Sequence, residues 1–305
     1  MANTTFSGPV RSENGFAIAN KNSSTGIVTD SSVHSSAAKD VRRYYLEEYF
    51  KKRPALNAVL NTAFSDADAT AAANTAIRLA EKVANKDFQV LGTSMTTALC
   101  TFDTTRAGII ITTAGTDEDQ AIIAPHLDTN QTAWAAVPWG TENQTIWECV
   151  VTTAASIADI KLWAGLKLTN DQLVATDANQ AYFKFQTDAT NSEAFTDFTL
   201  LHFVHSIANT DYISALPITV AADTQYHLKI AIDSNRKAAI YVNGIQYNVT
   251  STSGSTGGTA VTTGTGKTAA LTEVDLIPYI GVETGAGSAK ALKAHWQAIS
   301  RLIYE

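Results

Sequence analysis

The chain has 305 residues, of which 45% are hydrophobic and 17% are charged, and its formal net charge is −7 at pH 7. This composition is typical of a globular protein and excludes a chain that is disordered or collagen-like throughout. No run approaches the roughly 18 consecutive apolar residues of a membrane span, and the first residues lack the basic and apolar regions of a secretory signal. We therefore expect neither a membrane protein nor one exported by a visible signal.

Residues 1–38 are rich in Ser, Asn, Thr and Gly and show little hydrophobic periodicity. Such a segment buries too little apolar surface to fold alone, so we expect an extended N-terminal arm that a partner holds in place. Residues 1–60 carry eight Lys or Arg against five Asp or Glu, whereas residues 61–305 carry 14 against 24. A mildly basic arm thus precedes an acidic body, and the acidic body argues against nucleic-acid binding.

Residues 39–86 have the pattern of a short helical segment. The residues at helical spacing in its first part are Val41, Tyr44, Tyr45, Glu48 and Tyr49. Pro54 ends this predicted helix, a second one is predicted from about residue 56 to 64, and an alanine-rich third one from 65 to 84. The apolar stripe of the third helix is thin, so we expect that helix to need neighbours for its stability.

After about residue 87 the hydrophobic period changes from 3.6 to 2, which is typical of β-strands. The alternation is clear at residues 109–113, 226–232 and 276–282. Asn243 followed by Gly244 is a strong signal for a type I′ turn, so residues 226–249 are expected to form a three-stranded antiparallel meander. Many short strands without intervening helices predict two packed antiparallel sheets over residues 87–305.

Several of these strand segments resemble the concanavalin-A-like lectin/glucanase jelly roll, and together they span roughly residues 88–305. The segments are GIIITTA (108–114), DQAIIAP (119–125), WECVV (147–151), AGLKLT (164–169), YHLKIAID (226–233) and IYVNG (240–244). The expected fold is therefore mainly β: a concanavalin-A-like antiparallel β-sandwich (jelly roll) preceded by the extended N-terminal arm and the short helical segment. The Ser/Thr/Gly tract at residues 250–268 is expected to be an exposed loop.

Three further stretches are similar to virion structural proteins of marine tailed phages, including cyanophages. They are TFSGPVRSENGF (5–16), LIPYIGVE (276–283) and ISR (299–301). For a lectin-like sandwich in such a phage, the resemblance implies one of three roles: a capsid decoration (cement) protein, a head fibre or a tail adhesin. The resemblance alone does not choose among these roles.

The carboxylates do not form the pattern that catalysis by this fold requires. Glucanases with this fold use an E-x-D-x-E run, because residues at i, i+2 and i+4 of a strand share one face of the cleft. The sequence has no such run: Glu148 is a lone acid, Asp233 begins a turn, and residues 117–119 lie in an apparent hairpin loop. We therefore expect a protein that is not an enzyme.

The sequence also gives little support for a metal or a cofactor. His202 and His205 are three apart in an apparent strand, so they should point to opposite faces and cannot bind one metal together. Asp117, Glu118, Asp119 and Asp128 lack the dense alternation of a calcium loop, as do Asp66 and Asp68. Cys100 and Cys149 have no metal-binding spacing and are expected to be buried thiols.

The five tryptophans divide into two groups. Trp147, Trp163 and Trp296 lie within strand patterns and are expected in the core. Trp134 and Trp139 lie in an apparent loop. Because aromatic faces pair well with the apolar faces of sugars, these two are the candidate glycan contacts, and we expect them to be exposed.

The leading hypothesis is a non-enzymatic capsid decoration protein that assembles in the host cytoplasm, is anchored through residues 1–86 and displays its sandwich on the virion surface. Its expected partners are the major capsid protein and neighbouring copies of itself in a homo-oligomer, with no nucleic acid and no membrane. Aromatic residues dominate interface hot spots. The candidate interface residues are Phe6, Arg11, Phe16, Tyr44, Tyr45, Tyr49 and Phe50. Burial of the last four inside the chain's own core is an equally open alternative.

A carbohydrate-binding host-adhesion protein, on the tail or on a head fibre, is the alternative function. It predicts binding of a host surface glycan through Trp134 and Trp139. A third hypothesis is the major capsid protein itself, which needs a long spine helix and a mixed α+β body. The persistent period of two after residue 87 counts against that third hypothesis.

Overall fold

The computed structural model describes only part of the chain. The described residues are 19–21, 28–30, 42–52, 54–57, 88–125, 139–168, 172–188, 195, 197–249, 259–260 and 273–303. The chain divides into two compact units, Met1–Lys39 and Asp40–Glu305. In the first unit, strand β1 (Ala19–Lys21) pairs antiparallel with β2 (Val28–Asp30).

The second unit contains a nine-stranded sheet and an eight-stranded sheet. In spatial order, the nine-stranded sheet consists of β17 (Thr259–Ala260), β13 (Thr210–Thr219), β12 (Leu200–Ile207), β11 (Gln180–Gln186), β10 (Ile160–Lys167), β18 (Ile277–Thr284), β8 (Gln120–Pro125), β5 (Phe88–Gly92) and β4 (Ala55–Asn57). The eight-stranded sheet consists of β16 (Ile245–Tyr247), β15 (Ala238–Val242), β14 (Gln225–Ile232), β9 (Ile146–Thr153), β19 (Ala291–Leu302), β7 (Ile109–Thr112) and β6 (Cys100–Phe102), with β3 (Arg43–Glu48) also paired to β19. Among the described residues, short 3-10 helices connect strands at η2 (Thr97–Leu99), η4 (Thr141–Asn143) and η5 (Val174–Thr176).

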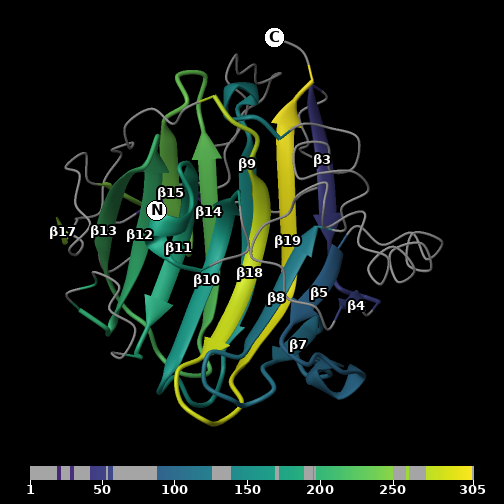
Figure 1. Cartoon of the computed structure of the whole chain (residues 1–305). Coiled ribbons are helices and arrows are strands. Elements are labelled where there is room, and N and C mark those ends of the chain that lie inside the picture. Colours follow the sequence, from purple (N-terminus) through teal and green to yellow (C-terminus); the bar gives the residue numbers. More distant parts are fainter. Residues whose placement is uncertain are drawn as a thin grey trace, which may run out of the picture. The chain divides into compact units, whose positions relative to one another are not determined.

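The predicted class, a mainly β protein with two antiparallel sheets forming a sandwich, is confirmed. Among the described strand pairs, the parallel ones are β13 with β17 and β4 with β5. Figure 1 shows β10, β18 and β8 running side by side in the middle of the nine-stranded sheet. Strand β14 follows the expected alternation, because Tyr226, Leu228, Ile230 and Ile232 are buried and the residues between them are partly exposed.

The first predicted helix, which Pro54 was expected to end, is wrong over its described residues. Residues Arg43–Glu48 form β3, which pairs antiparallel with the second half of β19, and Figure 1 shows these two strands side by side. Tyr44 and Leu46 also fit a period of two, and both pack against the hydrophobic core. Pairing with β19 and burial of these side chains outweigh the local helical pattern, since tertiary contacts override weak intrinsic propensities.

The second predicted helix is wrong at its start, because Leu56 lies in β4, paired in parallel with Val90 of β5. The rest of that helix and the third helix, residues 65–84, lie outside the described residues. The sandwich therefore begins before residue 87. Both of its sheets use strands from the segment that the sequence pattern marked as helical.

The meander predicted over residues 226–249 is confirmed. Strand β14 pairs with β15, and β15 pairs with β16, all antiparallel. Asn243 and Gly244 both have positive φ, 52° and 80°, as a type I′ turn requires. Asn243 also accepts a hydrogen bond from the His227 backbone N–H at 2.8 Å, which joins the turn to β14.

The loop at residues 117–119 is not a hairpin. It leads from β7 in the eight-stranded sheet to β8 in the nine-stranded sheet, so it crosses between the layers. Asp119 is buried, and its carboxylate accepts the Thr116 backbone N–H at 2.6 Å. Of the tract at residues 250–268, only β17 lies within the described residues.

Candidate functional site

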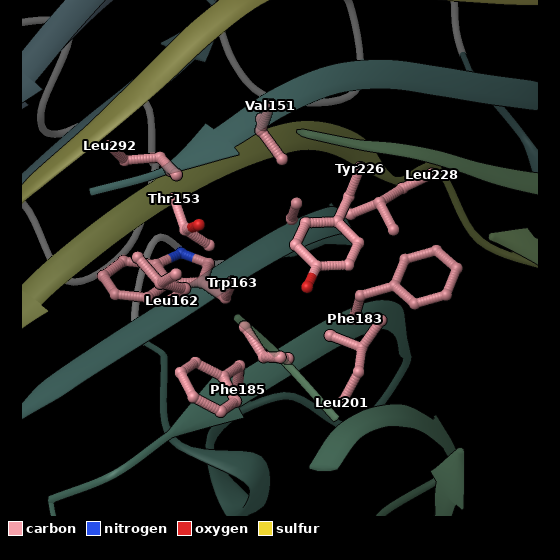
Figure 2. A pocket seen from close by; sticks show the side chains of 12 residues that line it. Val151, Thr153, Leu162, Trp163, Phe183, Phe185, Leu201, Tyr226, Leu228 and Leu292 are labelled. Carbon is pink, nitrogen blue, oxygen red and sulfur yellow. The ribbon is translucent and has the colours of Figure 1, made fainter. Parts of the chain in front are cut away.

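The outer face of the nine-stranded sheet, which points away from the eight-stranded sheet, carries polar side chains that are buried. Figure 2 shows Leu162 and Phe183 of this sheet gathered with Tyr226 and Leu228 of the other sheet around one hollow between the layers. Because successive residues of a strand point to opposite faces, their neighbours Lys161 and Lys184 lie on the outer face. Both lysines are fully buried.

Four polar residues form one row across four adjacent strands of this face. Lys161 of β10 lies opposite Gln186 of β11 on one side and opposite Glu283 of β18 on the other. Glu283 in turn lies opposite Gln120 of β8. Together with Asp188, which follows β11, these residues are called the Lys161 cluster.

The charges within the Lys161 cluster are close together and shielded from water. The Lys161 ammonium donates a hydrogen bond to Glu283 Oε1, and Lys161 Nζ lies 3.6 Å from Asp188 Oδ2. The exposed fractions of the side chains are 0% for Lys161, 4% for Asp188 and 2% for Glu283. Burial raises the pKa of Glu283, while the hydrogen bond and charge of Lys161 act in the opposite direction.

A second buried lysine, Lys184, joins the sheet to a covering segment formed by Gln172 and η5. Lys184 Nζ donates to the backbone oxygen of Gln172 at 2.9 Å and also to its side-chain oxygen. The Tyr182 hydroxyl donates to the same backbone oxygen at 3.2 Å. Lys167 Nζ lies 3.9 Å from the Asp177 carboxylate at the far end of η5. The covering segment is therefore attached to the sheet face by several polar contacts.

Trp163 lies in the same row as Lys184, on the neighbouring strand β10. Trp163 lies opposite Gly281 of β18, and a Cβ added at Gly281 would overlap the indole ring. Trp163 is 1% exposed. The absence of a side chain at residue 281 thus lets the tryptophan lie across the neighbouring strand.

This arrangement differs from that of a hydrolytic carboxylate pair. Glycoside hydrolysis needs two carboxyl groups that reach a sugar and, in inverting enzymes, a water molecule between them. In the Lys161 cluster both carboxylates, Asp188 and Glu283, are buried and interact with the same ammonium group. Both carboxylates are therefore engaged with Lys161 inside the protein rather than open to a substrate.

The acids examined in the sequence lie elsewhere. Glu148 lies on the outer face of the eight-stranded sheet, with its carboxylate 3.0 Å from His227 Nε2 and 3.5 Å from Lys229 Nζ. Asp233 accepts backbone N–H groups of Asn235 and Lys237, at 2.8 and 2.9 Å, and so stabilises a turn.

The candidate interface residues have different surroundings. Phe6, Arg11 and Phe16 lie outside the described residues. Phe50 is fully buried, with its ring centroid 6.4 Å from that of Phe88. Tyr44 and Tyr45 are partly buried on β3, whereas Tyr49 is 43% exposed, with its ring 6.3 Å from Trp296. Of these four aromatic residues, Phe50 belongs to the core and Tyr49 is accessible.

Trp139 does not occupy the exposed position that a glycan contact needs. Its side chain is 0% exposed, and its ring centroid lies 5.9 Å from that of Tyr44. The prediction of an exposed Trp139 is wrong, because β3 places an aromatic partner against a segment that reads as a loop. Trp134 lies outside the described residues.

Other predictions from single residues are confirmed. Trp147, Trp163 and Trp296 are buried. Cys100 and Cys149 are buried and form no disulfide. His202 and His205 lie on opposite faces of β12: His202 has an edge-on ring contact with Phe195, and His205 stacks on Tyr212.

Neither the Lys161 cluster nor Lys184 was predicted from the sequence. The signal was present as lysines inside long apolar strands, IKLWAGLK (160–167) and QAYFKFQ (180–186). A lysine flanked by apolar residues on both sides, in a strand with both faces buried, requires a buried partner.

The hollow between the sheets is a second candidate site. Its volume is about 40 Å³. A volume of roughly 10–15 Å³ is enough to admit one water molecule. Its lining is largely apolar, with Val151, Leu201 and Leu292 among the contributors (Figure 2). The hydroxyl of Thr153 is directed to the backbone oxygen of Ala221, at 2.6 Å.

Within the described ranges, no group of three or more His, Cys, Asp or Glu side chains is placed to hold a metal ion. The same part of the chain contains no helix long and apolar enough to cross a membrane.

No protein-family model matches the chain, and no curated protein matches it. Solved structures with a similar fold include a protein of unknown function from Shewanella oneidensis, with 9% identity, coverage of 85% of this chain and 87% of that chain, and a TM-score of 0.48. An alginate lyase from Corynebacterium is 11% identical over 77% of this chain and 97% of that chain, with a TM-score of 0.40. A β-1,3-glucanase from Mycobacterium marinum is 10% identical over 64% and 74%, with a TM-score of 0.36. The activity in each name is a property of that protein.

Proposed function

We propose that the protein is a non-enzymatic virion structural protein, a capsid decoration protein whose first unit anchors it and whose sandwich is displayed on the particle. The observation that carries the proposal is the division of the chain into the units Met1–Lys39 and Asp40–Glu305. A decoration protein needs a segment that docks on the capsid and a body that is stable without it. The two sheets lie in the second unit, which supports that separation of roles.

The closed outer face of the nine-stranded sheet supports a structural role over a catalytic one. Its two cluster carboxylates bind Lys161 inside the protein, and Gln172 and η5 cover the neighbouring Lys184. Under this proposal the first unit contacts the major capsid protein and neighbouring copies of the same chain. Repetition over a symmetric capsid adds avidity even where each contact is weak.

The experiment is co-sedimentation with capsids of a phage that carries the protein. The full chain is expected to sediment with the capsids, whereas a chain lacking residues 1–39 stays in the supernatant and keeps the melting temperature of the sandwich. Tyr49→Ser tests the exposed aromatic residue near the start of the sandwich, with Leu173→Ser, which is similarly exposed, as the matched control. Equal sedimentation of the shortened chain would show that the first unit is not the anchor.

A carbohydrate-binding host-adhesion role is the second candidate, and one patch favours it. On the outer face of the eight-stranded sheet, exposed Tyr49 lies beside Trp296, and Trp296 lies 6.4 Å from the His227 ring. The exposed Tyr49 ring, which packs against the buried Trp296, offers an aromatic face on which a sugar ring can stack. Glycan-array binding that is lost in Tyr49→Ala and kept in Leu173→Ala would favour this role.

A further inference from the structure

The Lys161 cluster contains an amine and two carboxyl groups in a region without water access. Lys161 extends from β10, Asp188 follows the end of β11, and Glu283 lies on β18, so three neighbouring parts of the sheet supply one group each. Lys161 Nζ contacts Glu283 Oε1 and lies 3.6 Å from Asp188 Oδ2. Neutralising one lysine does not require two carboxyl groups.

Burial changes the chemistry that is available to these groups. Removing charges from water is costly, and a low-dielectric surrounding favours a neutral amine beside a neutral carboxylic acid over the separated ions. A neutral amine is a nucleophile, and a protonated carboxyl group is an electrophile that can lose water. The exposed fractions of 0%, 4% and 2% place the side chains of Lys161, Asp188 and Glu283 away from bulk water.

The backbone around the cluster holds the two reacting side chains in place. The residue before Asp188, Thr187, donates its N–H to Ile160 O at 2.9 Å and accepts the Ile160 N–H on its hydroxyl at 3.1 Å. Ile160 directly precedes Lys161, so this pair of hydrogen bonds holds the backbone next to Lys161 against the backbone next to Asp188. On the opposite side a Cβ at Gly285 would overlap Asp188, which shows how closely the chain encloses that side chain. Because the two side chains are held close together, the reaction does not depend on their meeting by diffusion.

We propose that Lys161 and Asp188 become joined by an isopeptide bond that forms spontaneously within the folded chain. Lys161 Nζ attacks the side-chain carboxyl carbon of Asp188, and a tetrahedral intermediate forms. Glu283 accepts a proton from the attacking nitrogen and delivers a proton to the departing hydroxyl. The new bond is N–C, the broken bond is C–O, and one water molecule leaves. No oxidant, cofactor or second substrate is required, and the inference does not depend on the proposed function.

Glu283 is a catalytic residue in this step, because it touches the reacting nitrogen. Its pKa is raised by burial, which makes a carboxyl group better able to carry a proton near neutral pH. Gln120 donates to Glu283 Oε2 and leaves Oε1 directed at Lys161.

The test is the intact mass of the purified full chain, followed by sequencing of its proteolytic peptides. The expected result is a mass lower than that of the linear sequence by one water molecule, and a branched peptide in which Lys161 is joined to Asp188. A folded wild-type chain with the full linear mass would overturn the proposal without any variant. Loss of water located at another residue, or a branch between Lys184 and Gln172, would overturn it as well.

Variants separate the roles of the three residues. Lys161→Arg and Glu283→Gln are expected to keep their full linear masses, since a guanidinium group is a poor nucleophile and an amide does not carry the proton. Lys237→Arg, at an exposed lysine, is the matched control and should lose water as the wild type does.

Asp188→Asn gives a signature that misfolding cannot imitate. The amide carbon still reacts with Lys161, ammonia leaves instead of water, and the product is chemically identical to that of the wild type. The variant and wild type are therefore expected to reach the same final mass and to yield the same branched peptide. A stable mass difference between them would count against the bond.

Discussion

His202 and His205 show how strongly single residues depend on their surroundings. Both lie on β12, and both are almost completely buried. His202 Nδ1 lies 3.0 Å from the backbone oxygen of Leu200, and the His205 ring stacks on Tyr212 at 4.7 Å between centroids. Burial lowers the pKa of His202 to about 4 and that of His205 to about 3. Both rings are therefore neutral in the folded protein at pH 7.

These two histidines predict a loss of stability in mild acid. In the unfolded chain each takes up a proton near its ordinary pKa of about 6.5, whereas the folded chain binds that proton only at about pH 4 and 3. The histidine contribution is complete above about pH 6.5 and falls as the pH drops. Between pH 7 and pH 5 the free energy of unfolding should fall by about 2 kcal/mol for each histidine.

Urea denaturation at pH 7 and pH 5 tests this prediction. The double variant His202→Gln, His205→Gln should show a smaller change between the two pH values than the wild type. His227→Gln, at a partly exposed histidine, is the control. Comparing the wild type with the double variant isolates the contribution of the two histidines to the pH dependence, because both proteins contain the same carboxyl groups. If the double variant has the same pH dependence as the wild type, His202 and His205 are not the source of the stability loss in acid.

The contact between Trp163 and Gly281 gives a second prediction at this scale. A Cβ at Gly281 overlaps the indole, whereas a Cβ at Gly287 meets nothing within 4 Å. Gly281→Ala should lower the free energy of unfolding by roughly 1–3 kcal/mol, the usual cost of overpacking a core. Gly287→Ala is the matched control and should change it little. Thermal and urea unfolding provide the measurement, and equal stabilities of the two variants would exclude the steric explanation.

Among the elements, β19 holds the eight-stranded sheet together. Its residues Ala291–Ala294 pair with β7, and Gln297–Leu302 pair with β3, while β9 runs along its other edge. The pairing of β19 with β9 shifts register between Ala294 and Trp296. At the same point the partner on the other edge of β19 changes from β7 to β3. Such an irregularity increases local twist, which allows one long strand to serve two short neighbours.

Arg43 fixes β3 onto this edge, and its removal is the prediction at the scale of the element. Its guanidinium donates to Gln144 O at 2.6 Å, to Ser300 O at 3.1 Å and to Ser300 Oγ at 3.1 Å. Arg43→Ala should cost about 1–3 kcal/mol, since it leaves partly buried carbonyl groups without their charged donor. Exposed Lys51→Ala is the control. Hydrogen exchange should be faster in β3 of Arg43→Ala and unchanged in β14; unchanged β3 exchange would contradict the role of Arg43.

At the scale of the whole sandwich, the two layers leave a partly open apolar pocket between them. The cavity of about 40 Å³ lies between β9 and β14 of one sheet and β10 and β11 of the other. Interiors are normally packed as closely as organic crystals, so the atoms around such a gap lose dispersion contacts.

Filling this gap should stabilise the protein. Val151 lines the cavity, and Val151→Ile adds one methylene group that the gap has room to accept. The free energy of unfolding should rise by up to about 0.8 kcal/mol, the transfer free energy of one methylene. Val242→Ile, at a buried residue outside the lining, is the control and should be neutral or destabilising. A loss of stability in Val151→Ile would show that the centre is already fully packed.

The strand period, the meander with its Asn243–Gly244 turn, and the burial of Trp147, Trp163 and Trp296 were all predictable from the amino-acid pattern. These features depend on local alternation and turn chemistry, which short segments carry on their own.

Features that depend on partners distant in the sequence could not be predicted in this way. Residues 43–48 are a strand because β19, some 250 residues later, supplies their hydrogen bonds. Trp139 is buried because Tyr44 packs on it. Lys161 tolerates complete burial because Glu283 and Asp188 converge on it from β18 and the end of β11. A local pattern does not reveal these contacts, since each requires two segments that meet only when the sheets are assembled.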